Sequence, residues 1–228
     1  EKLGVDIVNL AFEVDAPELE DAIKGLRALK MRGANVSMPN KTIVHQYLDE
    51  ISPAAKLCGA VNTIVNKDGY LVGHITDGIG YVQSLKDNDI DPTGKKVTIV
   101  GSGGAATAVE IQAALDGVAE MSIFARDDKF KQNALDTVKK INENTNCKAT
   151  FYPLEDLDKL KEEMHSSYLF TNATGVGMKP LEGQSVVPDK SYFRPELIVI
   201  DVPYSPLETK MRSMAKEVGC KTMNGLGM

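Results

Sequence analysis

The chain of 228 residues has no tryptophan, only three cysteines and only three histidines. Cys58, Cys147 and Cys220 lie far apart and form no CxxC pair, which fits neither a disulfide framework nor a cysteine-based zinc site. The histidines are equally scattered, so we expect no metal site. The simplest setting for such a chain is the reducing cytoplasm.

Long apolar runs and an excess of basic charge are also missing. No run approaches the ~20 residues of a membrane-spanning helix, and the first residues do not resemble a signal peptide. The net charge of −6 argues against nucleic acid as a partner, because phosphate binding needs concentrated basic surface. With 43% hydrophobic and 25% charged residues, the chain is typical of a globular protein with a sizeable core.

Strand-like and helix-like segments alternate, which predicts an α/β fold with mostly parallel sheets. A polar link near residues 88–94 predicts two domains, 1–88 and 89–228. In the first domain we predict strand, helix, strand, helix, hairpin and helix over residues 4–14, 16–30, 33–38, 41–57, 60–75 and 77–88. The second predicted helix ends near Ser52-Pro53, and the hairpin turns at Asn66 to Gly69.

The second domain opens with a strand, a glycine turn, a helix and another strand, the order of a dinucleotide-binding fold. Gly101 permits the tight turn, Gly103 lets the backbone approach a pyrophosphate, and Ala106 replaces the third glycine where helix and strand pack. Free N–H groups at the helix start would face the phosphates. The alternative is a glycine-rich turn of an unrelated α/β protein, but the flanking strands favour nucleotide binding.

The tip after the second strand bears on cofactor choice. An acid there accepts hydrogen bonds from the ribose of NAD, whereas an arginine pairs with the 2′-phosphate of NADP. The chain carries both kinds of side chain in Arg126, Asp127 and Asp128. This mixture predicts acceptance of NAD alongside NADP, and the alternative is an ordinary exposed charged loop.

Two residues of the first domain are candidates for moving a proton. Lys41 follows Pro39 in "NVSMPNK", and Asp77 precedes Gly78 at the start of a predicted helix. Taken alone, the lysine could be a solvated surface charge and the aspartate part of a helix cap. Their spacing in the sequence does not show whether the two side chains act together.

Seven motifs, taken together, resemble the shikimate dehydrogenase family, and most closely its quinate/shikimate dehydrogenase branch. They occur in the family's order and spacing over nearly the whole chain, as "NVSMPNK", "GAVNTI", "GHITDGIGY", "VGSGGAATA", "TNATGVGMKP", "DVPYSP" and "NGLGM". The resemblance implies a substrate domain followed by a Rossmann-like NAD(P)-binding domain. It also implies an oxidoreductase of the shikimate pathway that interconverts shikimate and 3-dehydroshikimate, or quinate and 3-dehydroquinate, with NAD, NADP or both.

The resemblance further implies roles for individual residues. Lys41 and Asp77 would be the catalytic pair, the lysine on the reacting hydroxyl and the aspartate orienting it. The other substrate contacts would be Ser37, Asn62 and Tyr204. The cofactor contacts would be Gly101, Gly103, Gly104, Ala105, Ala106, Arg126, Asp128, Thr174, Val176, Gly225 and Met228. A homodimer is one assembly compatible with the family.

Some positions depart from the family pattern. Met38, Asn40, Ile75 and Ala125 stand where other residues are usual. The family's N-terminal strand with its serine-rich motif and its C-terminal helices are missing, so we expect a chain truncated at both ends. The alternative function is a non-catalytic or regulatory dinucleotide-binding relative. Retention of Lys41 and Asp77 favours the enzyme.

Overall fold

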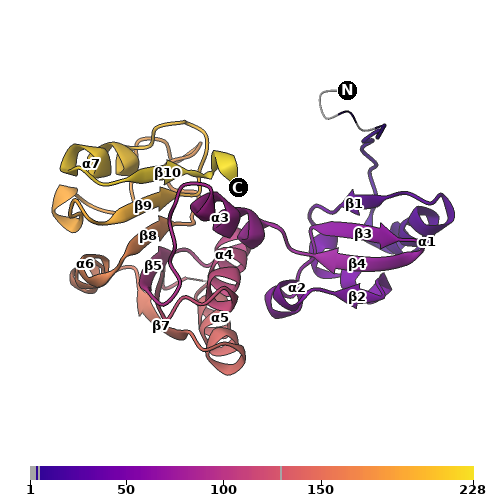
Figure 1. The fold of residues 1–228 in the computed structure, drawn as a ribbon, viewed down its shortest axis with the longest axis horizontal. Coiled ribbons are helices and arrows are strands. Elements are labelled where there is room, and N and C mark those ends of the chain that lie inside the picture. The colour runs from indigo at the N-terminus through magenta and orange to yellow at the C-terminus, as the bar shows by residue number, and fades with distance from the viewer. Residues whose placement is uncertain (1–3, 5, 129) are drawn as a thin grey trace. The chain divides into compact units, whose positions relative to one another are not determined.

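The computed structural model describes residues 4, 6–128 and 130–228, drawn as a ribbon in Figure 1. The chain divides into two compact units, one of Glu1–Ser52 with Gly59–His74 and one of Pro53–Cys58 with Ile75–Met228. Helix α3 (Asp77–Lys86) belongs by packing to the second unit. A Cβ on Gly78 would lie 2.2 Å from the Ala108 carbonyl oxygen, so α3 sits very close to its neighbouring helix. The packing boundary therefore precedes α3, and the functional boundary after residue 88 stays a prediction.

The first unit contains a four-stranded sheet in the order β1-β3-β4-β2. Strand β3 pairs antiparallel with β1 and β4, and β2 pairs parallel with β4. The predicted hairpin is confirmed, since Asp68 and Gly69 both have positive φ at the turn between β3 and β4. The elements are β1 (Gly33–Asn35), β2 (Glu50–Ile51), β3 (Thr63–Lys67), β4 (Tyr70–His74) and α1 (Leu19–Ala28).

Two predicted elements of this unit are wrong. The described residues of 4–14 form no strand, because none of their backbone groups is paired in a sheet, and Val8 and Phe12 are exposed. Residues 41–52 form no α-helix. They make the 3₁₀ turns η2 (Asn40–Thr42) and η3 (Val44–Tyr47), since consecutive β-branched residues disfavour an α-helix. Helix α2 (Pro53–Cys58) begins at the proline instead of ending there, because proline suits the first helical position.

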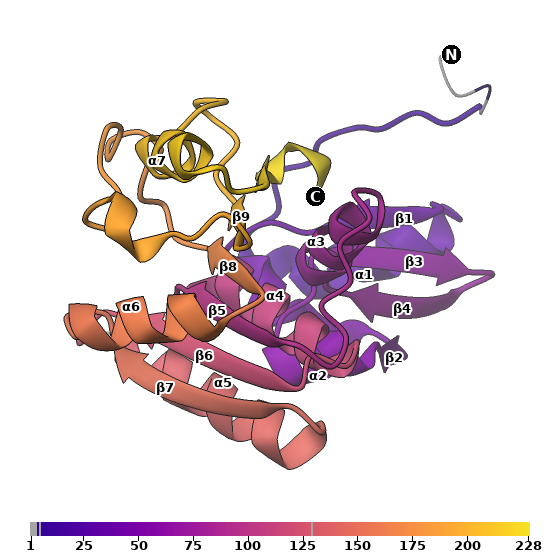
Figure 2. The same cartoon turned by 60° about the vertical axis from the view of Figure 1, so that its left-hand side comes forward.

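The second unit is built on a six-stranded parallel sheet in the order β10-β9-β8-β5-β6-β7. Figure 2 shows β9, β8, β5, β6 and β7 following one another in this order. The first strand of the sheet is central and the order reverses beside it, as in a dinucleotide-binding fold. The predicted α/β fold with a Rossmann-like domain is confirmed. The strands are β5 (Lys96–Val100), β6 (Glu120–Ala125), β7 (Lys148–Pro153), β8 (Leu169–Asn172), β9 (Ile198–Asp201) and β10 (Thr222–Asn224).

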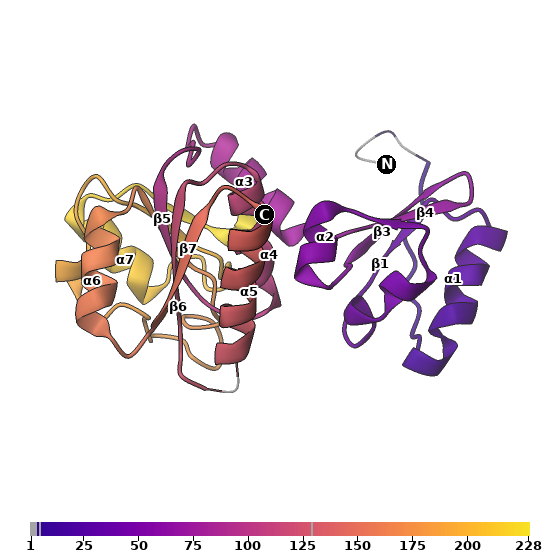
Figure 3. The same cartoon turned by 90° about the horizontal axis from the view of Figure 1, so that it is seen from below.

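Helices cover both faces of this sheet, as Figure 3 shows. We call one the α4 face, covered by α3, α4 (Gly104–Leu115) and α5 (Lys131–Asn144), and the other the α6 face, covered by α6 (Leu157–Ser166) and α7 (Lys210–Val218). Neighbouring strand residues alternate between the faces, so Ile99 joins the core of the α4 face and Val100 that of the α6 face. Shorter 3₁₀ turns are η1 (Ala16–Glu18), η4 (Lys190–Tyr192) and η5 (Gly225–Gly227). Among the described helices, none is both long and apolar enough to cross a membrane.

Candidate functional site

The predicted cofactor-binding residues all follow the carboxyl ends of strands in the six-stranded sheet. The glycine turn follows β5, Arg126 and Asp128 follow β6, Thr174 and Val176 follow β8, and Gly225 and Met228 follow β10. Carboxyl ends of parallel strands share one edge, so the fold collects these residues there. Ligands of such folds bind at this edge, where the strand order reverses between β5 and β8.

Glycine is present at the positions of this turn for two different physical reasons. Gly101 has φ +149°, and a Cβ on it would lie 2.8 Å from the Ala106 Cβ and 2.9 Å from the Ala173 carbonyl oxygen. The protein itself therefore requires glycine at 101. Gly103 and Gly104 are exposed, and a Cβ on either would meet nothing within 4 Å. These two leave open space at the start of α4, where free N–H groups favour an anion, so the turn fits a pyrophosphate.

The charged tip after β6, formed by Arg126, Asp127 and Asp128, contains an internal ion pair. The Arg126 Nε lies 3.3 Å from an Asp128 carboxylate oxygen, and the other Asp128 oxygen accepts a hydrogen bond of 2.9 Å from the Phe130 N–H. Asp127 instead pairs with Lys131 at 3.0 Å. Arg126 is well exposed, so its guanidinium is available to a phosphate while Asp128 stands beside it.

The segment after β8 is fixed by a buried polar network. The Asn172 side chain donates to Asp201 Oδ1 at 2.8 Å and to the Val176 carbonyl at 3.1 Å, and it accepts from the Thr174 N–H and hydroxyl. The Thr209 hydroxyl donates to the second Asp201 oxygen. Burial raises the pKa of Asp201 to about 6, although the hydrogen bonds from Thr209 and Asn172 oppose the rise.

The first unit brings three predicted substrate residues close together in the fold. The Val36 N–H donates to the Asn62 carbonyl at 2.8 Å, which places Ser37 at the end of the β1–β3 pairing. The Val61 N–H donates to the Lys41 carbonyl at 2.8 Å. Ser37, Lys41 and Asn62 therefore lie on backbone segments that are hydrogen-bonded to one another. Lys41 itself is half-buried in η2.

The remaining predicted substrate residues belong to the second unit. Asp77 is the first residue of α3, and Tyr204 is exposed in the loop after β9. Residues 225–228 pack closely against both the loop after β9 and α3. A Cβ on Gly225 would lie 1.8 Å from the Val202 carbonyl oxygen, and one on Gly80 would lie 2.7 Å from the Met228 backbone. Lys41 and Asp77 fall in different units, so their pairing belongs to the proposal below.

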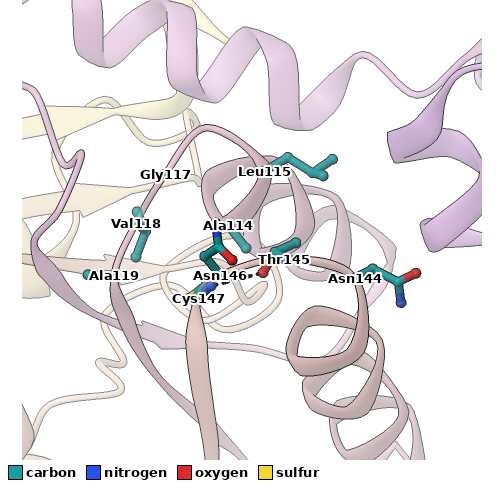
Figure 4. Close-up of a pocket in the computed structure, with 9 residues that line it drawn as sticks. All are labelled: Ala114, Leu115, Gly117, Val118, Ala119, Asn144, Thr145, Asn146 and Cys147. Carbon is teal, nitrogen blue, oxygen red and sulfur yellow. Dashed lines mark hydrogen bonds between the residues drawn. The ribbon is translucent and has the colours of Figure 1, made fainter.

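A pocket of the second unit lies away from all of these residues (Figure 4). Its walls come from the ends of α4 and α5 and from the turns that lead into β6 and β7. Those turns stand at the amino ends of the strands, whereas the glycine turn stands at the carboxyl ends. The lining residues are Ala114, Leu115, Gly117, Val118, Ala119, Asn144, Thr145, Asn146 and Cys147.

Sequence reasoning missed the network behind the Thr174 segment. Asn172 lies in "TNATGVGMKP" and Asp201 in "DVPYSP", but the motifs alone predict no role for either residue. The available signal is position, because each is the polar last residue of a short strand that begins with apolar residues. Polar residues at the carboxyl end of a buried parallel strand are candidates for a site.

Comparison with known proteins places the chain among characterised relatives. The profile of the "Shikimate dehydrogenase substrate binding domain" matches residues 1–64. The chain is 60% identical over 227 residues to "Shikimate dehydrogenase (NADP(+))" of Listeria innocua, covering 100% of this chain and 78% of that protein. The crystal structure of shikimate 5-dehydrogenase from Listeria monocytogenes in complex with shikimate and NAD superposes with a TM-score of 0.96 at 59% identity, over 99% of this chain and 78% of that one.

A relative named as a quinate dehydrogenase is less similar to this chain than these two. Quinate dehydrogenase from Corynebacterium glutamicum, in complex with NAD, has a TM-score of 0.82 at 26% identity over 95% of this chain and 75% of that one. The comparisons thus do not single out the quinate branch to which the motifs pointed.

Proposed function

The chain belongs to the shikimate dehydrogenase family, and we propose that it interconverts shikimate and 3-dehydroshikimate by hydride transfer with NADP or NAD. The observation that carries the proposal is the 60% identity to a relative of this name along 227 residues of the chain. The edge of the six-stranded sheet supports it, because every residue expected at the cofactor follows a strand there. The cofactor, when bound, accepts or donates the hydride at its nicotinamide ring.

The residues at this edge would hold the cofactor from end to end. The N–H groups at the start of α4 would bind the pyrophosphate over Gly103, Gly104 and Ala105. Arg126 and Asp128 would meet the adenosine ribose, the arginine favouring a 2′-phosphate and the aspartate a free hydroxyl. Thr174, Val176, Gly225 and Met228 would flank the nicotinamide, and Gly101 and Ala106 would keep the turn in shape.

Two side chains would handle the hydroxyl proton of the substrate. When hydride leaves the ring carbon, the hydroxyl proton must also leave, so a group within hydrogen-bond reach lowers the barrier. Lys41 would contact that hydroxyl and Asp77 would orient it. Lysine acts as a base only when neutral, and a nearby carboxylate favours its charged form. Lys41 therefore has two candidate roles, proton acceptor and positioning hydrogen-bond donor.

The other substrate contacts would recognise the rest of the molecule. Ser37 and Asn62, on hydrogen-bonded segments of the first unit, would bind ring hydroxyls. Tyr204 would lie near the carboxylate. Use of quinate as a second substrate, a homodimer and a cytoplasmic location stay predictions. Rates with quinate and the mass in solution test the first two of these.

Steady-state rates with shikimate and quinate, each with NAD and NADP, test the function. We expect turnover with shikimate, and Lys41→Ala and Asp77→Ala should each lower kcat by about 100-fold or more, because each removes a group from the proton step. Cofactor binding, followed by nucleotide fluorescence, should survive in both variants. Tight nucleotide binding without turnover of either acid would instead support the non-catalytic relative, and near-normal kcat in either variant would remove that residue from the catalytic pair.

A pair of glycine variants tests the cofactor position. Gly103→Val should keep the folded state, because its new side chain points into open space, but should weaken NAD(P) binding by at least about 10-fold by filling the room of the pyrophosphate. Gly101→Val is the matched control. It should lower the melting temperature, because its Cβ would collide with Ala106 and Ala173. Unchanged affinity in Gly103→Val would show that the cofactor lies elsewhere.

A further inference from the structure

Asp201 is a fully buried carboxylate that the mechanism above does not use. It ends β9, in register with Asn172 at the end of the neighbouring parallel strand β8. Its two oxygens accept from two neutral donors, the Asn172 side chain and the Thr209 hydroxyl. The positive charge that favours its ionised form belongs to Arg212 of α7.

Asn172 transmits the position of this carboxylate to the loop after β8. Its amide uses both donors and both acceptor sites, on Asp201, the Val176 carbonyl, and the Thr174 N–H and hydroxyl. The Val176 carbonyl can only accept and the Thr174 N–H can only donate, so the amide has a single orientation. In addition, the Thr174 hydroxyl accepts from the Val176 N–H at 3.1 Å, which closes the loop on itself.

The same loop touches the glycine turn. The Ala173 N–H donates to the Val100 carbonyl at 2.8 Å, and the Ala173 carbonyl oxygen faces Gly101. A shift of the 173–176 backbone would therefore move the wall of the predicted cofactor site on its nicotinamide side. A misplacement of about 1 Å at such a site lowers rates by up to ~100-fold.

We propose that Asp201 is a positioning residue that, through Asn172, holds residues 173–176 against the glycine turn and so sets the affinity for the nicotinamide cofactor. The inference rests on the proposed function, since it takes the edge of the sheet as the cofactor site. A purely structural carboxylate would change stability alone. The positioning role predicts a change in cofactor KM beyond the change in stability.

Three variants separate these roles. Asp201→Ala removes both acceptors and should raise the KM for NAD and NADP by about 10-fold or more, with a smaller effect on the KM for shikimate. Glu163→Gln is the control, because Glu163 is also buried in a polar network on the same face. Its partner Lys96 is the first residue of β5, at the amino ends of the strands, whereas the loop follows their carboxyl ends. Glu163→Gln should lower the melting temperature while leaving cofactor KM within about twofold.

Asp201→Asn keeps the shape and tests the charge. An amide accepts from Asn172 and donates to the Thr209 hydroxyl, which can rotate to accept, so the fold should survive. Because the pKa of Asp201 lies at about 6, the wild-type KM for NAD should rise as the pH falls through that value, and Asp201→Asn should show the acid value at every pH. NAD is the probe, because the 2′-phosphate of NADP titrates in the same range.

The outcomes are distinct. Absence of nucleotide binding by the wild-type enzyme would overturn the proposed function and this inference with it. If the wild-type enzyme turns over shikimate but Asp201→Ala alters the melting temperature alone, the inference fails and the proposed function stands. If Asp201→Ala does not fold, the pH profile of Asp201→Asn decides, and a profile that follows the wild-type profile would overturn the positioning role.

Discussion

The two faces of the six-stranded sheet bury one glutamate each, in opposite ways. Glu163 of α6 accepts from Ser122 at 2.6 Å and pairs with Lys96 at 2.7 Å and Lys159 at 2.8 Å. Burial alone would raise the pKa of Glu163, but the hydrogen bonds from Lys159, Lys96 and Ser122 outweigh it and lower the pKa to about 2. Glu110 of α4 is fully buried, and neither of its carboxylate oxygens has a partner among the described residues.

Burial therefore raises the pKa of Glu110 to about 8. On the α6 face the folded state is stabilised when Glu163 is ionised. On the α4 face the folded state is more stable when Glu110 is neutral. The same side chain thus stabilises one face near neutral pH and destabilises the other. The contrast shows that the partners of a buried acid, and not its burial, decide the sign of its contribution.

The largest effect should come from breaking the network of the α6 face. Glu163→Ala leaves Lys96 and Lys159 without their buried partner, so we expect a loss of ~2–4 kcal/mol in the free energy of unfolding at pH 7, measured by urea denaturation. Because the folded pKa is lowered, this contribution is present above the ordinary glutamate value of 4.5 and is lost as the pH falls toward 2.

The neighbouring Glu162 supplies the control for that variant. It also pairs with Lys159, at 2.9 Å, but its side chain is 68% exposed. Glu162→Ala should therefore change the free energy of unfolding by less than about 1 kcal/mol. Equal losses in the two variants would mean that the Glu163 network contributes no more than a surface ion pair.

The second effect has the opposite sign and belongs to the α4 face. Glu110→Gln should stabilise the protein by ~1–3 kcal/mol at pH 8, because the amide is neutral in both states whereas the ionised Glu110 of the unfolded chain must take up a proton to fold into an apolar site. The folded pKa of Glu110 is raised, so the wild-type protein loses stability as the pH rises from 4.5 to about 8, and the advantage of the variant should vanish near pH 4.5. Glu143→Gln, on the exposed side of α5, should show no such pH dependence. A constant difference between pH 4.5 and 8 would place a partner on Glu110.

Part of this contrast can be seen in the sequence. The helix of Glu163 reads "LDKLKEEMHS", with Lys159 four residues earlier, whereas the helix of Glu110 reads "GAATAVEIQAAL" and contains no basic residue. An i,i+4 partner is thus predictable and its absence is visible. The cross-sheet partners of Glu163 are not, because Lys96 and Ser122 reach it only through strand order.

The same distinction applies to the fold and the candidate site: features set by local sequence could be predicted, and features set by contacts distant in sequence could not. Local signals predicted the glycine turn, the hairpin at Asp68-Gly69 and the alternation that gives the parallel sheet. The helix prediction over residues 41–52 is wrong, because the β-branched run at 42–44 disfavours an α-helix and the segment forms short 3₁₀ turns. The Asn172–Asp201 contact depends on the register of two strands that are far apart in sequence. The pairing of Lys41 with Asp77 stays a prediction, and the two residues belong to different compact units. The local pattern of apolar and polar residues predicts neither of these two pairings.

The smallest effect concerns a buried hydrogen bond between two neutral side chains on the α4 face. The Tyr81 hydroxyl of α3 and the Thr171 hydroxyl of β8 share a hydrogen bond of 2.6 Å, and both residues are buried. Burial raises the pKa of Tyr81, so the pair stays uncharged at neutral pH. Tyr81→Phe should lower the free energy of unfolding by ~1 kcal/mol, equally at pH 5 and 8, because it leaves one buried hydroxyl unpaired. Adding Thr171→Val removes that orphan, so the double variant should be less destabilised than the sum of the two single variants. Strict additivity in urea denaturation would show that the two hydroxyls are not coupled, and that apolar packing alone fastens α3 to the sheet.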